Sequence, residues 1–159
     1  MPRRSAKSRK IDGPAKAPLG ALVGCRFHEL RMKFAEAGLR PTRQRLSLGW
    51  LLFSRGSRHL TAEILQDEAQ ASNVPVSLAT IYNNLHQFTG AGILREIAVD
   101  GTRTYFDTNT LRHHHFLVDG ALVDIPEVAI DLLNLPPPPA GKAVAAVEVV
   151  VRLRDAPAA

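Results

Sequence analysis

The sequence predicts an α+β fold, with an N-terminal winged helix-turn-helix domain and a small C-terminal α/β dimerisation domain. Three observations predict it. Helical spacing of apolar residues recurs between residues 26 and 90, two strand-like segments then flank a turn signal at Asp100-Gly101, and the composition changes after residue 112. We expect four consecutive parts: a disordered basic tail (1–20), the winged-helix domain (21–108), a hinge (109–112) and a dimerisation and sensing domain (113–159).

Composition and charge limit the class of protein. The chain has 159 residues, 45% of them hydrophobic, so it can bury a core. No apolar run reaches the roughly 18 residues of a membrane-spanning helix, so we expect a cytoplasmic protein without membrane contact. Cys25 is the single cysteine, which excludes an internal disulfide framework. The net charge of +5, concentrated before residue 113, indicates a polyanion partner, although a basic tail can also serve solubility.

Two helices follow the tail. Apolar residues at helical spacing, ended by Gly38, predict the first helix over about 26–37. Thr42 caps a second helix of about 43–53. Cations at a helix N-terminus oppose the helix dipole, so an arginine cluster there indicates a nearby anion such as a DNA phosphate. A solvated basic surface is the alternative. The cluster is Arg40, Arg43 and Arg45.

The next two helices form the predicted helix-turn-helix. A loop over 54–60 holds His59, Thr61 caps the third helix, and Ser77 caps the fourth after a break at 72–76. The outer face of the fourth helix carries uncharged hydrogen-bonding side chains: Thr80, Tyr82, Asn83, Asn84 and Gln87. Asn and Gln can read adenine and hydroxyls can hold phosphates, so this face suits a DNA groove. An ordinary polar surface helix is the alternative.

A hairpin follows the fourth helix. Residues 93–99 and 102–106 read as strands around a two-residue turn, which is the wing of a winged helix. Arg103 beside the turn is placed to reach a phosphate or the minor groove, and a plain hairpin with one exposed arginine is the alternative. The candidate DNA contacts are Arg40, Arg43, Arg45, Ser77, Thr80, Tyr82, Asn83 and Arg103.

The part after the hinge reads as a small α/β unit. Residues 113–118 and 121–125 are strand-like, 126–135 a short helix, 136–139 a polyproline joint, and 143–153 a β-branched strand. So small a unit is marginally stable alone, and its apolar strand invites pairing with a second chain. We therefore expect a homodimer, which also matches a two-fold site on double-stranded DNA.

Histidines concentrate at the hinge. On a strand, His113 and His115 share one face and His114 takes the other, so two imidazoles can meet one metal. Such nitrogen and oxygen ligands suit iron, manganese or zinc, and imidazole also suits haem iron. A solvated histidine cluster is the alternative. The candidate metal ligands are His59, Asp107, His113, His115 and Asp124, and the candidate haem ligands are His113, His114 and His115.

A metal-dependent hydrolase is a hypothesis from another class. The histidines lack the H-E-x-x-H spacing, and no obvious general base lies beside them in the sequence. This hypothesis also leaves the fourth helix and the basic N-terminal part unexplained. We therefore expect that the protein is not an enzyme.

The chain resembles the ferric uptake regulator family over roughly residues 24–153, and within it the iron response regulator branch of alphaproteobacteria. The matching segments are 38–45, 59–63, 76–82, 100–107 and 113–115. The resemblance implies a homodimeric transcription factor that controls iron and haem metabolism and senses haem. It also implies DNA contacts at Arg40, Thr80, Tyr82 and Asn83, and a hinge metal site from the candidate ligands above.

The sequence departs from the family pattern at three places. The paired cysteines that follow the histidines in the wider family are absent, so a structural zinc site there is not expected. Gly24-Cys25-Arg26 stands where some branch members have Gly-Cys-Pro, which makes the histidines better haem candidates than Cys25. Near the last strand only Glu148 can serve a second metal site. The alternative function is a divalent-metal-responsive or peroxide-responsive regulator without haem sensing.

Overall fold

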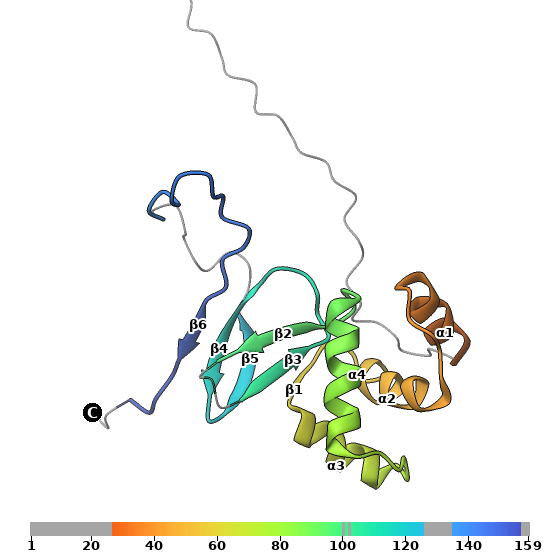
Figure 1. The fold of residues 1–159 in the computed structure, drawn as a ribbon. Helices are drawn as coiled ribbons and strands as arrows, with labels where there is room; N and C mark the ends of the chain where they lie inside the picture. The colour runs from red at the N-terminus through yellow and green to blue at the C-terminus, as the bar shows by residue number, and fades with distance from the viewer. Residues whose placement is uncertain (1–26, 100, 102, 126–134, 157–159) are drawn as a thin grey trace, which may run out of the picture.

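The computed structural model describes residues 27–99, 101, 103–125 and 135–156. The basic tail, Cys25 and nearly all of the helix expected over 126–135 lie outside the described residues. Helices gather on one side of the molecule and two small sheets on the other (Figure 1). This mixture of separate helices and mainly antiparallel strands is that of an α+β protein, as predicted.

Four helices make up the helical side: α1 (Phe27–Glu36), α2 (Arg43–Phe53), α3 (Ala62–Ala71) and α4 (Leu78–Gly90). The three predicted N-caps are confirmed. The hydroxyl oxygens of Thr42, Thr61 and Ser77 each accept a hydrogen bond from the backbone N–H three residues later. At the end of α1, Gly38 has a φ of +73°, a left-handed conformation that favours glycine.

The strands form two three-stranded sheets. The first has the order β1-β3-β2, and the second has the order β5-β4-β6. All pairings are antiparallel except β4 with β6, which is parallel. The bounds are β1 (His59–Leu60), β2 (Arg95–Ala98), β3 (Thr104–Asp107), β4 (His114–Val118), β5 (Ala121–Ile125) and β6 (Val150–Arg152).

Two apolar clusters hold these elements. The larger one joins the four helices and includes Phe34, Leu85 and Phe88, all fully buried. The smaller one joins the β2–β3 hairpin to the second sheet through Ile97, Tyr105 and Leu122. The Tyr105 hydroxyl also donates to the Gly120 carbonyl at 2.6 Å. The hairpin expected to act as a wing therefore packs directly on the sheet expected to sense the effector.

Three expectations about local structure are wrong. His59 does not lie in a loop but begins β1, whose partner β3 is remote in sequence. Asn84 does not face outward but is 8% exposed, because its amide bonds Arg45 and the Thr80 carbonyl. The strand expected over 143–153 is regular only over β6, since the Val149 N–H donates to the His114 ring and not to a strand partner.

Within the described part of the chain, every helix is too short or too polar to cross a membrane.

Candidate metal centre and DNA-facing surface

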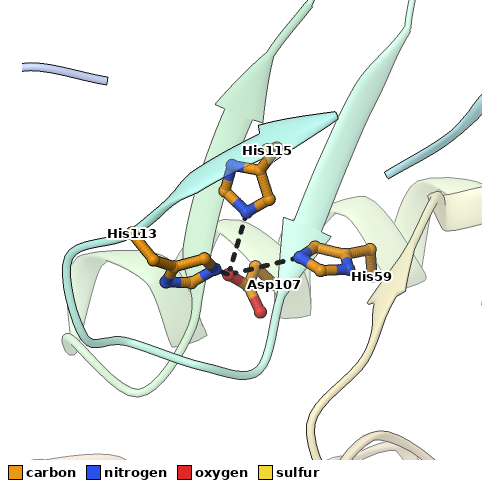
Figure 2. A group of neighbouring side chains, drawn as sticks. All are labelled: His59, Asp107, His113 and His115. Carbon is orange, nitrogen blue, oxygen red and sulfur yellow. Dashed lines mark ion pairs between the residues drawn. The ribbon is translucent and has the colours of Figure 1, made fainter. Parts of the chain in front are cut away.

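Five side chains converge where the two sheets meet. Each His Nε2 lies 3.0–3.8 Å from a carboxylate oxygen of each aspartate. Figure 2 shows three imidazole rings pointing at one carboxylate from different strands and from the segment before β4. The five residues, called the metal cluster below, are His59, Asp107, His113, His115 and Asp124.

Strand register brings four of these residues together. His59 on β1 is the cross-strand partner of Asp107 on β3, and His115 on β4 is the partner of Asp124 on β5. Paired residues on neighbouring antiparallel strands have side chains on the same face and within contact distance. Each sheet thus contributes one histidine and one aspartate. His113 shares its face with His115, as strand alternation predicts.

The segment before His59 is fixed on both sides. The Arg58 guanidinium contacts both carboxylate oxygens of Glu68 on α3, at 2.6 and 3.1 Å. The Arg58 backbone N–H donates to the Thr108 hydroxyl, and its carbonyl accepts from the Thr108 N–H. The residue before β1 is therefore anchored to α3 and to the residue after β3, which fixes the backbone of His59 relative to Asp107.

Asp107 is the buried centre of the cluster, with 0% of its surface exposed. Burial acts to raise its pKa, but the nearby rings of His115 and His59, and the Asn109 N–H donating to Oδ1 at 2.7 Å, hold the pKa below the ordinary range. The carboxylate is therefore ionised at neutral pH. Asp124, whose side chain is 43% exposed, closes the open side of the site.

The donor atoms fit a divalent ion. Oδ2 of Asp107 and the Nε2 atoms of His59, His113 and His115 are buried without a well-formed hydrogen bond. Zinc bonds of 2.0–2.1 Å place tetrahedral ligand atoms about 3.3 Å apart. The His Nε2 to Asp oxygen distances of 3.0–3.8 Å are close to this value, and the four ligand atoms of His59, Asp107, His113 and His115 all lie within 4.8 Å of one another. Three imidazole nitrogens and two carboxylate oxygens suit zinc, iron or manganese. Unpaired buried acceptors around one point are costly unless a cation satisfies them.

His114 lies apart from the metal cluster. Its Nδ1 accepts a hydrogen bond of 3.2 Å from the Val149 N–H. In a neutral imidazole the other nitrogen, Nε2, then carries the proton and has no lone pair for iron. Of the three candidate haem ligands, the structure directs two into the metal cluster and fixes His114 in a tautomer that opposes ligation through Nε2.

The predicted DNA contacts lie on α2, α4 and the β2–β3 hairpin. Arg40, Arg43, Ser77, Asn83 and Arg103 are exposed, while Thr80 and Tyr82 are half-buried. The Tyr82 hydroxyl donates to Glu63 on α3 at 2.9 Å, which together with burial raises the pKa of Tyr82. Any contact of this hydroxyl with DNA must compete with Glu63.

Arg45 differs from the other predicted DNA contacts, because its guanidinium is used inside the protein. It donates to the Arg40 carbonyl at 2.7 Å, to Asn84 at 3.3 Å and to Gln87. These bonds tie the start of α2 to α4. Arg45 thus sets how the two helices meet, and its guanidinium donors are engaged by protein groups.

Sequence reasoning missed the residues that support the site. Asn109 holds Asp107 through a backbone bond two residues along, a pattern that Asp-x-Asn could have signalled. Arg58, Glu68 and Arg95 act across long sequence distances and gave no local signal.

Comparisons with known proteins agree with this architecture. The model of the ferric uptake regulator family matches residues 36–135. The peroxide-responsive repressor PerR of Staphylococcus epidermidis is 36% identical over 102 residues, covering 61% of this chain and 67% of that protein. The Staphylococcus aureus PerR is 37% identical over 103 residues, covering 61% and 68%.

Solved structures share the fold. The ferric uptake regulator from Pseudomonas aeruginosa with manganese has a TM-score of 0.60 and 23% identity, covering 79% of this chain and 96% of that one. The Vibrio cholerae ferric uptake regulator has a TM-score of 0.65 and 22% identity, covering 79% and 99%. The family model matches most of the chain, and these structures reproduce its architecture. The chain therefore belongs to the ferric uptake regulator family.

Proposed function

We propose that this chain is a transcription regulator that binds a two-fold DNA site as a homodimer, under the control of a divalent metal ion held by the metal cluster. One observation carries the proposal: donor atoms from both sheets converge on a single point, each sheet giving a His and an Asp. A site built in this way responds to an ion by changing how the two sheets are held together.

The DNA-binding half rests on α3, α4 and the β2–β3 hairpin, which follow one another as in a winged helix. The exposed side of α4 offers Asn83, and Arg43 stands exposed at the start of α2. Amide groups read base edges and arginines hold phosphates. Dimeric DNA binding is a property of the family, and the two-fold operator is our proposal for this chain.

The ligands of the metal cluster come from both sheets. His59 and Asp107 fix the first sheet and the helices behind it, and His115 and Asp124 fix the second sheet. When bound, a divalent ion supplies the positive charge that satisfies all five donors at once. The relative orientation of the two sheets, and with it that of α4, is then better defined than in the metal-free protein.

The geometry favours an ion over haem as the effector. His113 and His115 direct Nε2 into the metal cluster, and His114 holds the tautomer that disfavours ligation. The pocket beside His113 and His114 has a volume of about 300 Å³, at the lower limit for small-molecule sites. Haem sensing, and with it the iron response regulator branch, stays a prediction. The relatives named above are peroxide-responsive repressors, which supports the metal or peroxide alternative.

The test is DNA binding with and without metal. Duplexes selected from a random library in Mn²⁺ are expected to share a two-fold site. The affinity of the protein for these duplexes is expected to fall about 5–150-fold when a chelator removes the ion. This is the usual range when ligand binding at one site changes affinity at another. Equal affinity for selected and random duplexes in both conditions contradicts the proposal.

A hemin titration of the same complex separates the two effectors. A saturable Soret shift that disappears in a variant with alanine at His113, His114 and His115 would establish haem binding. Loss of the DNA complex at near-stoichiometric hemin would make haem the effector. Without these effects, haem is not the effector, and the chelator experiment decides whether the divalent ion is.

A further inference from the structure

Arg95 occupies an unusual place between the two sheets. It begins β2, where its cross-strand partner on β3 is Asp107, the buried centre of the metal cluster. Its side chain is only 14% exposed. A guanidinium that is so nearly buried needs partners for its donors, and the partners it has lie outside its own sheet.

The Arg95 guanidinium joins three segments. Nη1 donates to the Leu111 carbonyl at 2.5 Å, in the connection between the sheets. Nη2 donates to Glu148 Oε1 at 2.5 Å, just before β6 of the second sheet. One planar group therefore bonds the chain between β3 and β4 and the segment before β6, and links both to the first sheet. The guanidinium of arginine has several donors in a fixed geometry, which the single ammonium of a lysine lacks.

The Leu111 carbonyl has a second donor, His113. Nδ1 of His113 lies 2.8 Å from this oxygen and 3.3 Å from Arg95 Nη1. A carbonyl oxygen can only accept, so Nδ1 must carry the proton at the shorter of these two contacts. Nε2 of His113, which lies 3.0 Å from Asp107 Oδ2 at the centre of the metal cluster, is then the ring nitrogen that can offer a lone pair to an ion.

We propose that Arg95, held by Glu148, is a positioning residue for the metal centre. Arg95 fixes the Leu111 carbonyl, which selects the His113 tautomer able to bind a metal. Because Arg95 begins β2, it also links the occupancy of the metal site to the position of the β2–β3 hairpin. This inference rests on the proposed function. Groups that orient a ligating imidazole typically change metal affinity by about 10–100-fold when removed.

Three variants test the proposal. Arg95→Met removes the fork but keeps an unbranched chain of similar reach. Glu148→Gln keeps the shape of the partner and removes its charge. Arg112→Met is the matched control. Arg112 also joins the connection to the segment before β6, through the Ala145 carbonyl at 2.7 Å, and this bond involves neither Leu111 nor His113.

The first readout uses metal-free protein. Long-range proton–nitrogen correlation spectra of the histidine rings report which nitrogen of His113 carries the proton. We expect a proton on Nδ1, bonded to the Leu111 carbonyl, in the wild type and in Arg112→Met, and a partly populated form without this proton in Arg95→Met. An unchanged Nδ1–H form in Arg95→Met overturns the proposal, whatever its metal affinity.

The second readout is Mn²⁺ affinity, measured together with thermal stability. We expect a loss of at least tenfold for Arg95→Met, a smaller loss for Glu148→Gln and none for Arg112→Met. Wild-type affinity in a folded Arg95→Met or Glu148→Gln overturns the proposal; the glutamine variant decides if the methionine variant does not fold. Failure of the wild type to bind Mn²⁺ would instead refute the proposed function.

Discussion

Replacing His59 by alanine tests whether one ion holds both sheets. His59 is the ligand that β1 contributes, and its Nε2 lies 3.0 Å from Asp124 across the boundary between the sheets. Losing one of five donors is expected to weaken metal binding by 100-fold or more. Removal of groups that only orient a ligand already costs about 10–100-fold.

The expected magnitude follows from linkage. At a free Mn²⁺ concentration of 100 times the wild-type Kd, the ion stabilises the wild type by about 2.7 kcal/mol. At the same concentration a variant with a 100-fold weaker site gains only about 0.4 kcal/mol. For a chain of this size each kcal/mol moves Tm by about 2–4 °C, so the metal-dependent rise falls from about 5–11 °C to about 1–2 °C.

The assay is thermal unfolding with Mn²⁺ and with a chelator, in the wild type, in His59→Ala and in a control. His86→Ala is the control, because His86 lies on α4, pairs with Glu96 and is half exposed. We expect the control to keep the full rise in Tm. If His59→Ala also keeps it, the ion is not shared between the sheets and the coupling argument fails.

Three further predictions address the framework of the site. Tyr105→Phe removes the bond to the Gly120 carbonyl and should lower stability by about 1 kcal/mol, seen in urea denaturation; an unchanged midpoint would mean that this bond contributes nothing. Gly49→Ala places a Cβ 2.4 Å from the buried ring of Phe34 and should destabilise by about 1–3 kcal/mol; equal or higher stability would contradict the packing. Arg43→Ala should weaken DNA binding and flatten its salt dependence by about one unit of log–log slope, whereas Arg45→Ala should chiefly reduce stability; the reverse pattern would refute the roles assigned to them.

Features that act within a few residues could be read from the sequence. The caps at Thr42, Thr61 and Ser77 were predictable because a cap bonds the backbone N–H three residues later. The shared face of His113 and His115 was predictable because strand alternation has a period of two. Both rules need no knowledge of the rest of the fold.

Features that depend on remote partners could not be read in this way. His59 forms a strand only because β3 supplies its hydrogen-bonding partner. The Asn84 amide oxygen is satisfied inside because Arg45, 39 residues earlier, donates to it, while its NH₂ group donates to the Thr80 carbonyl. The helical pattern predicts the position of Asn84 around α4 but cannot say that a polar side chain there is satisfied inside. Propensity and pattern thus fail where a distant side chain supplies the missing bond.

The small size of the shared core limits how the protein can respond to a metal. Within the described residues, the buried apolar contact between the hairpin and the second sheet consists of Ile97, Tyr105 and Leu122, with partly buried residues packed against them. Fully burying one apolar side chain is worth about 1.5–3 kcal/mol, so three give about 5–9 kcal/mol before ordering costs. The cost of ordering these side chains and their backbone offsets much of this gain and brings the net contribution toward that of an ion. A ligand contribution of about 2.7 kcal/mol moves an even balance of two orientations to about 100:1. A larger shared core would hold one orientation whether or not the ion is bound. Under the proposed function, a small apolar contact bridged by the metal cluster would allow a bound ion to set the orientation of α4.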